Sequence, residues 1–309
     1  MEKNWLNTSA SFKAKVIGKL LGDGCITMQE GRKPRFQFTH VSRDYSWSNY
    51  CYLQLLEFLP LSPPKYKKNI DHRLQQGYSL SYYVQSRTAD MITYLRLKWY
   101  PVNKKKIPFD LISKYFDEQS LAWWYMDDGH LKLEGNKPRK IILSTESFNK
   151  SENSWLIDFL KEKYNLHFYL DKQNRIILYD QFQIYYFLHL VTPYLHGSMH
   201  RKFLKSCEYR FHIPNKRTTI YLPTSIALKY PTKEINGALY ELDKLINIYK
   251  RGKFYKRNFF LFNENNEMPT KGYQIILESD NLSRLCFMKG VTGLTFSKLA
   301  EISFKTTLY

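Results

Sequence analysis

Two segments of this chain end in the same way, with an apolar run followed by an acid and a glycine. They are VIGKLLGDG at residues 16–24 and LAWWYMDDG at residues 121–129. Polar residues suited to an N-cap precede each run, Ser9 or Ser11 in one case and Asp117 or Ser120 in the other. Each segment therefore predicts a helix that stops at its glycine, and aligning the two glycines matches Asp23 with Asp128.

The residues that follow each glycine also repeat. An alternating stretch, a polar turn and a second alternating stretch predict a β-hairpin at 25–41 and another at 130–145. Helical patterns follow at 45–58 and 151–163, strand patterns at 77–86 and at 167–180, and closing helices at 89–99 and 182–194. We therefore predict an α+β fold with two pseudo-symmetric αββαββα halves, residues 1–104 and 105–205, and a C-terminal extension, 206–309.

An acid at the end of each helix needs a physical reason. A helix C-terminus carries partial negative charge, which makes an Asp there unfavourable by up to ~1 kcal/mol unless a cation compensates it. Two such ends packed side by side would gather carboxylates, the ligands that Mg²⁺ prefers. Gly18 and Gly22 would allow that close packing. The alternative is that each Asp-Gly pair only forms a turn; the repeat favours the metal site.

The charge of the chain indicates its partner. There are 47 Lys and Arg against 28 Asp and Glu, a net charge of +19, which favours a polyanion such as nucleic acid over a merely basic soluble protein. The four cysteines, Cys25, Cys51, Cys207 and Cys286, form no CxxC pair, so we expect buried thiols rather than zinc ligands. No signal peptide or membrane span is apparent, so an intracellular, soluble protein is expected.

The paired motifs resemble those of the LAGLIDADG homing endonucleases, most closely the monomeric, intron-encoded branch. The likeness extends over residues 12–205 and includes LSPPKYKK (61–68), NKKKIP (103–108), ILSTESF (142–148) and TPYLHGSMHRK (192–202). It implies a DNA-binding saddle and a Mg²⁺-dependent enzyme that cuts both strands of a long double-stranded DNA site with short 3′ overhangs. It also implies a monomer in a bacterial or phage cytoplasm or an organelle matrix.

Two alternatives stay open on the same scaffold. One is a maturase that binds intron RNA and assists group I intron splicing. The other is a DNA-binding regulator that has lost catalysis, although the retention of both acids speaks against it.

The resemblance also implies roles for individual residues. The last acid of each motif binds metal, which points to Asp23 and Asp128, and their neighbours Gly22 and Asp127 are predicted to belong to the same site. Each half supplies a lysine near the cleavage centre, and Gln37 resembles a residue that positions water. By position the two lysines are Lys105 and Lys202, for which simple phosphate contact is the alternative.

Recognition needs a separate surface, which two twisted antiparallel sheets in the major groove can provide. Alternation along the strands predicts that these side chains face DNA: Arg35, Gln37, Thr39, Lys132, Lys140 and Ser144.

The extension contains two further patterns. The segment KLINIYKRGKFYKR at 244–257 has no acid and predicts contacts to the DNA backbone, with a solvated helix face as the alternative. Residues 272–304, a strand and two helices joined at Gly293, resemble a ribbon-helix-helix DNA-binding unit, with a small helical cap as the alternative. The basic residues proposed for the backbone contacts are Lys250, Arg251, Lys253, Lys256 and Arg257.

Overall fold

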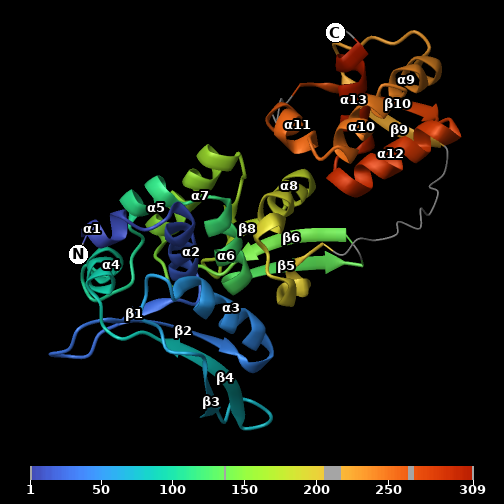
Figure 1. Ribbon diagram of the computed structural model, residues 1–309. Coiled ribbons are helices and arrows are strands. Elements are labelled where there is room, and N and C mark those ends of the chain that lie inside the picture. The colour runs from blue at the N-terminus through green and yellow to red at the C-terminus, as the bar shows by residue number, and fades with distance from the viewer. Residues whose placement is uncertain (1, 136, 205–216, 264–267, 308–309) are drawn as a thin grey trace. The chain divides into compact units, whose positions relative to one another are not determined.

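The computed structural model describes residues 2–135, 137–204, 217–263 and 268–307 (Figure 1). The chain folds into two compact units. The first comprises Met1–Lys132, Ile141–Leu178 and Leu188–Leu204, and the second comprises Leu133–Lys140, Tyr179–Phe187 and Lys205–Tyr309. Residues 205 and 206, where we predicted the extension to begin, lie outside the described residues, so the predicted boundaries of the two halves and of the extension stay predictions.

The first motif opens an αββαββα series. The elements are α1 (Glu2–Leu6), α2 (Ala10–Leu21), β1 (Cys25–Thr27), β2 (Arg35–Val41), α3 (Tyr45–Leu55), β3 (Lys65–Ile70), β4 (Tyr78–Gln85), α4 (Asp90–Trp99) and α5 (Phe109–Tyr115). The strands form an antiparallel sheet in the order β1-β2-β4-β3. Strand β3, KYKKNI, was not among the strands that we predicted, because its side chains are nearly all exposed and show no alternation.

The second motif opens the same series. Its elements are α6 (Glu118–Asp128), β5 (Gly129–Glu134), β6 (Lys137–Leu143), α7 (Lys150–Tyr164), β7 (Tyr169–Leu170), β8 (Ile176–Leu178) and α8 (Gln181–Val191). The strand order β5-β6-β8-β7 matches that of the first sheet position by position. Two 3₁₀ helices, Thr192–Tyr194 and Gly197–Lys202, follow. The predicted α+β fold with two pseudo-symmetric halves is confirmed.

Helices α2 and α6 pack directly against each other, as the paired glycines predicted. Ser9 caps α2, and Asp117 forms a capping box with Ser120 at the start of α6. A Cβ added to Gly18 would lie 2.5 Å from the Ser120 carbonyl oxygen and 2.6 Å from Trp123 Cβ. The two helices therefore meet through their backbones at this point, and their C-terminal ends point the same way.

The second unit holds the C-terminal segment. Its elements are β9 (Arg217–Pro223), α9 (Pro231–Leu239), α10 (Leu242–Lys250), α11 (Phe254–Phe262), β10 (Thr270–Ile276), α12 (Ser279–Thr292) and α13 (Phe296–Thr307). The strand and two helices expected at 272–304 are present, and Gly293 separates the helices with φ +78°. Strand β10, however, pairs with β9 of the same chain, whereas the strand of a ribbon-helix-helix unit pairs with a second chain.

Two other expectations can be compared with the described residues. Cys25, Cys51 and Cys286 are free thiols, and Cys207 lies outside the described residues. Among the helices that the structure describes, none is long and apolar enough to cross a membrane.

Candidate active site

The shared end of α2 and α6 gathers the acids of both motifs. Asp23 follows Gly22, the C-cap of α2, and Asp128 is the last residue of α6. A Cβ added to Gly22 would lie 2.5 Å from Asp127 Cβ, and the Asp23 backbone N–H donates to Asp127 Oδ2 at 3.2 Å. The structure thus brings the two helix ends, and the acids they carry, into one site in the first unit.

The charges of these carboxyls are poorly compensated. Burial, then the neighbouring Asp127 charge, raises the pKa of Asp23 to about 8. Burial and the same neighbour raise the pKa of Asp128 to about 7. Asp23 and Asp128 therefore hold protons more tightly than an exposed Asp does, which means that the site favours any additional positive charge.

Two lysines approach this end of the helices in matching ways. Lys105 Nζ donates to the carbonyl oxygens of Gly22 at 3.3 Å and Gly24 at 2.9 Å, on either side of Asp23. Lys202 Nζ donates to the carbonyl oxygens of Tyr125, at 2.9 Å, and Gly129, around Asp128.

Each ammonium thus sits at the negative end of one motif helix, where a cation is favourable. Burial lowers the pKa of both lysines, that of Lys202 to about 8, with a further contribution there from Arg201. The structure places Lys105 and Lys202 next to the acids, as the resemblance implied; their catalytic role stays a prediction.

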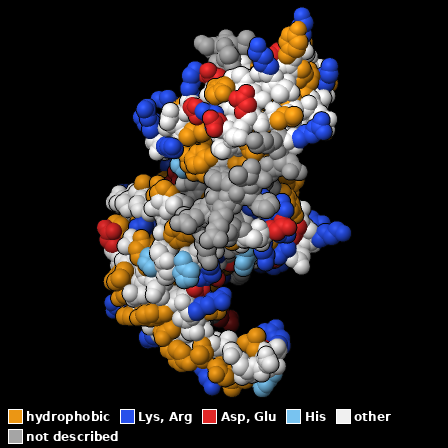
Figure 2. All heavy atoms as spheres, turned by 90° about the vertical axis from the view of Figure 1, so that its right-hand side faces the viewer, with side chains coloured by type: hydrophobic (Ala, Val, Ile, Leu, Met, Phe, Trp, Pro, Cys, Tyr) orange, Lys and Arg blue, Asp and Glu red, His pale blue; other side chains and the backbone are white. Residues whose placement is uncertain are grey.

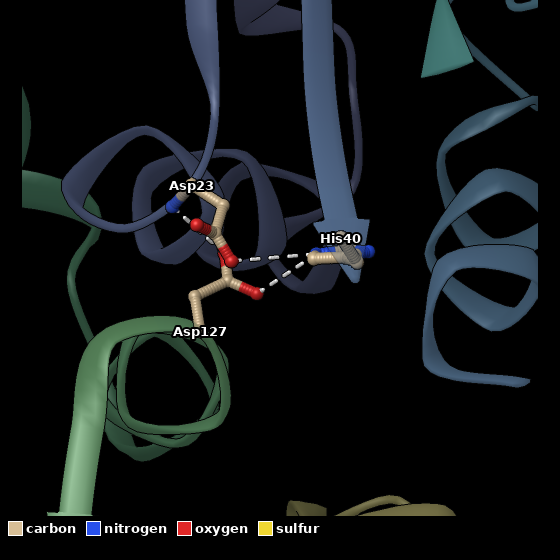
Figure 3. Close-up of side chains that lie close together, drawn as sticks. All are labelled: Asp23, His40 and Asp127. Atoms are coloured by element: carbon tan, nitrogen blue, oxygen red, sulfur yellow. Dashed lines mark hydrogen bonds and ion pairs between the residues drawn. The ribbon is translucent and has the colours of Figure 1, made fainter. Parts of the chain in front are cut away.

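A buried network lies beneath the acids, and Figure 3 draws two of its members, His40 and Asp127. Lys19 Nζ donates to Asp127 Oδ1 at 2.8 Å and lies 3.0 Å from His40 Nε2, and the Lys19 and Asp127 side chains have 0% exposure. Trp47 Nε1 also donates to Asp127 Oδ1 at 2.8 Å. Burial alone would raise the pKa of Asp127, but Lys19 and His40 hold it well below its usual range. Asp127 is therefore an ionised partner of a buried lysine.

Asp23, His40 and Asp127 have ligand atoms within 4.8 Å of one another, the spacing of a metal site (Figure 3). The Lys19 ammonium, however, already lies within hydrogen-bonding distance of two of the three residues. Burial and the Lys19 charge also lower the pKa of His40, which favours its neutral form. A second cation enclosed by this trio would be repelled at close range by the ammonium. The carboxylates better suited to a metal are those of Asp23 and Asp128.

A cavity of about 370 Å³ opens at Asp23. On its wall, Arg201 donates to both carboxylate oxygens of Asp44, at 2.8 and 2.9 Å, and so fixes the segment that precedes Lys202. The lining residues are Asp23, Thr39, His40, Val41, Arg43, Asp44, Asp127, Gly129, His130, Leu131, Arg201 and Lys202.

The predicted recognition residues of β2 share one face of the strand. Arg35, Gln37 and Thr39 alternate with the buried Phe36, Phe38 and His40, as the pattern predicted. Gln37 Oε1 accepts from Gln85 Nε2 at 3.0 Å, which holds Gln37 within the sheet and outside the lining of the Asp23 cavity. A second cavity, of about 490 Å³, lies over this face, lined by Gln37, Thr39, Tyr66, Lys67, Asn69, Tyr83 and Gln85.

The corresponding residues of the second sheet are arranged differently. Lys132 is exposed, whereas Lys140 and Ser144 are half-buried. The Ser144 backbone N–H donates to the Asp128 carbonyl oxygen at 3.0 Å, which ties β6 to the end of α6. The DNA contacts assigned to these residues stay predictions.

Our sequence reasoning missed Lys19, His40, Asp44 and Arg201. A signal existed for the first two. Lys19 stands inside an apolar helical run, and His40 falls on the inward face of β2 by the same alternation that places Phe36 and Phe38 there. Nothing in the local pattern links Asp44 with Arg201, which are 157 residues apart in the chain.

The fold and the paired acids define a class of protein, in which two α+β halves meet through helices that end in an acid. A family model described as the LAGLIDADG DNA endonuclease family matches residues 13–186, more than half of the chain. The chain belongs to this family.

Individual relatives are consistent with that assignment. The chain is 30% identical over 202 residues to an uncharacterised protein of Methanocaldococcus jannaschii, covering 63% of this chain and 74% of that protein. It is 30% identical over 216 residues to the probable intron-encoded endonuclease 1 of Wickerhamomyces canadensis, covering 66% and 88%. Among solved structures, the homing endonuclease I-WcaI bound to its DNA recognition sequence matches with a TM-score of 0.56 and 27% identity, over 65% of this chain and 89% of that one.

Proposed function

We propose that this chain is a homing endonuclease that makes a metal-dependent double-strand break in a long DNA site. The observation that carries the proposal is the pair of acids at the adjoining ends of α2 and α6, each raised in pKa and each flanked by a lysine whose ammonium binds helix-end carbonyls. Both motifs come from one chain, so we propose that it acts as a monomer.

The surface supports a DNA partner. The chain has a net charge of +19, and on the face that Figure 2 shows, Lys and Arg side chains are widespread and Asp and Glu side chains are fewer. Arg35, Gln37 and Thr39 offer hydrogen-bonding groups on the open face of β2, as a strand that reads base edges in the major groove requires. We assign base readout to this sheet and to its counterpart β5–β8.

The donor set fits Mg²⁺. Asp23 and Asp128 are oxygen ligands whose negative charge a dication would compensate. We propose that the main-chain oxygens of Asp127 and of Gly22, which also accepts from Lys105 Nζ, complete the set. The Asp127 carboxylate is not available for this role, because its Oδ1 already accepts hydrogen bonds from Lys19 Nζ and Trp47 Nε1. When bound, Mg²⁺ polarises the scissile phosphate and lowers the pKa of water.

The chain's own groups position and stabilise the reaction. A water oxygen forms a bond to phosphorus as the bond to one ester oxygen breaks, and no covalent enzyme intermediate is required. Lys105 and Lys202, held by helix-end carbonyls, offset the negative charge that develops on the phosphoryl oxygens. The water-positioning role assigned to Gln37 would have to act from the sheet face, because Gln37 lies outside the lining of the Asp23 cavity. One acid and one lysine lie at the end of each motif helix, and we propose that each such pair serves the cut in one DNA strand. Two cuts give the double-strand break with short 3′ overhangs.

The test uses the purified full chain and DNA fragments that span candidate insertion sites, with Mg²⁺ or with EDTA. We expect double-strand cleavage only with Mg²⁺, and its loss in both Asp23→Asn and Asp128→Asn variants while DNA binding is retained. Asp110→Asn is the matched control, because Asp110 lies on the surface in a pair with Lys98; it should cut normally.

Two results would contradict the proposal. One is cleavage that persists in both acid variants, and the other is a loss of DNA binding as large as the loss of cutting. Preferential binding to intron RNA over every DNA fragment, with no cleavage, would favour the maturase alternative instead.

A further inference from the structure

A short turn connects α10 and α11 in the C-terminal segment (Figure 1), and five cations lie in or beside it. The chain turns at Gly252, whose φ of +68° favours glycine. Three backbone bonds close the turn: Arg251 N–H to the Asn247 oxygen, Gly252 N–H to the Tyr249 oxygen, and Lys253 N–H to the Ile248 oxygen, at 2.8–3.2 Å. We define the α10–α11 corner as Lys250, Arg251, Lys253, Lys256 and Arg257.

Packing fixes which way this corner faces. Phe254 and Phe259 are 1% and 0% exposed, and Tyr255 is also buried. The Tyr249 ring contacts Phe254 and Phe287, each with a centroid distance of 6.0 Å, and so anchors the corner to α12. With Phe254, Tyr255 and Phe259 turned inward, the charged residues of the corner all lie exposed, beside the exposed Phe260 and Leu261. The backbone that carries the cations is thus held in place before any ligand arrives.

The cations of the corner are not neutralised by ion pairs within the described part of the second unit. Among residues 217–263 and 268–307, none of the five cations forms an ion pair. Asp243 binds Arg284 at 2.8 Å, although the Lys250 charge also helps to lower the pKa of Asp243, and Glu301 binds Lys305 at 2.7 Å. The first turn of α11 contains no acid. Cations gathered with so few acids repel one another, which a phosphate backbone would relieve.

We propose that the α10–α11 corner binds the phosphate backbone of duplex DNA that flanks the stretch held by the motif-bearing unit. This inference rests on the proposed function. The corner reads no sequence, because its groups are flexible cations without a fixed set of hydrogen-bond partners, so it adds affinity and not specificity. Because both binding surfaces belong to one chain, the second contact forms at high effective concentration once the first has formed.

The experiment compares two duplexes, one limited to the minimal cleaved site and one extended by about 20 base pairs on each side, a length well beyond one helical turn of DNA. The dissociation constant of the full chain is measured in EDTA across a range of salt concentrations. The test variant changes Arg251, Lys253, Lys256 and Arg257 to Ala. The matched control changes four other exposed cations of the second unit, with the same loss of charge: Arg217, Lys229, Lys233 and Lys271.

We expect the corner variant to lose about tenfold or more in affinity for the extended duplex at low salt. The slope of log K against log salt should fall by about 0.9 for each phosphate that the variant no longer neutralises, or about 3 to 4 for four phosphates. Binding to the minimal duplex and its cleavage should stay unchanged, and the control variant should follow the wild type. Thermal unfolding of the variants confirms that they fold.

The result that overturns the proposal is an equal effect of both variants, or no effect of either, on the extended duplex. A weaker affinity for RNA competitor with an unchanged affinity for duplex DNA would also overturn it, in favour of RNA as the partner. Failure of the proposed function is a separate outcome: the wild-type chain would then cut no DNA, whatever its flanks.

Discussion

The buried pair of Lys19 and Asp127 allows a quantitative prediction. Lys19 comes from the first motif helix and Asp127 from the second, and both side chains have 0% exposure. Removing one partner of a buried ion pair leaves an uncompensated charge and typically costs about 3–5 kcal/mol. Asp127 would keep its bonds from Trp47 Nε1 and the Asp23 N–H. We therefore expect Lys19→Met to lower the free energy of unfolding by about 3 kcal/mol, the lower end of that range.

A double-mutant cycle isolates the pair. Asp127→Asn alone leaves the Lys19 ammonium without its buried counter-ion and should lower the free energy of unfolding by about the same amount. The double variant has neither charge, so no buried charge is left unpaired. We expect the double variant to be about 2 kcal/mol more stable than the sum of the single changes predicts. The surface pair of Lys98 and Asp110, 37% and 61% exposed, is the control, and its cycle should give under about 1 kcal/mol.

The assay is urea unfolding followed by tryptophan fluorescence. All six tryptophans, at positions 5, 47, 99, 123, 124 and 155, lie in the first unit, so the signal reports the unit that holds the pair. Trp47 and Trp123 lie closest, with Lys19 Nζ at 5.1 and 5.9 Å from their rings. A cost below about 1 kcal/mol for Lys19→Met, the range of a surface pair, would refute the reasoning.

Three further predictions follow from the same site. Gly18→Ala should destabilise the first unit by about 1–3 kcal/mol, since its Cβ would meet backbone at 2.5 Å. Gly197→Ala in the same unit, where nothing lies within 4 Å, should not, and equal urea midpoints for the two variants would contradict this. In EDTA, Asp23→Asn should raise the melting temperature at pH 8 more than at pH 4. The folded carboxyl resists ionisation up to a pKa of about 8, so its destabilising effect grows as pH rises from about 4 toward 8; a gain independent of pH would argue against it. Lys202→Met should slow single-turnover cleavage by about 100-fold or more with less than about tenfold change in DNA affinity, and equal losses in both would indicate a phosphate-binding role only.

Local patterns in the sequence were enough to predict the architecture of the two halves. The repeat of an apolar helix, an acid and a glycine was visible at residues 16–24 and 121–129, and local rules of capping and alternation placed the elements that follow. Those rules did not predict strand β3, because a strand without a buried face shows no alternation of apolar and polar residues. Gly18 and Gly22 predicted the close helix contact, since only glycine permits it.

The tertiary structure alone decided what each acid does. Asp127 and Asp128 are adjacent and chemically identical, yet the twist of α6 turns the Asp127 carboxylate onto a buried ammonium and leaves Asp128 without an ion-pair partner among the described residues. Lys105 and Lys202 were found by resemblance, but their bonds to the helix-end carbonyls depend on how distant segments fold back. Electrostatic environment is a property of groups brought together from separate parts of the chain. A linear pattern therefore predicts which residues are charged and only the fold sets the charge that each one carries.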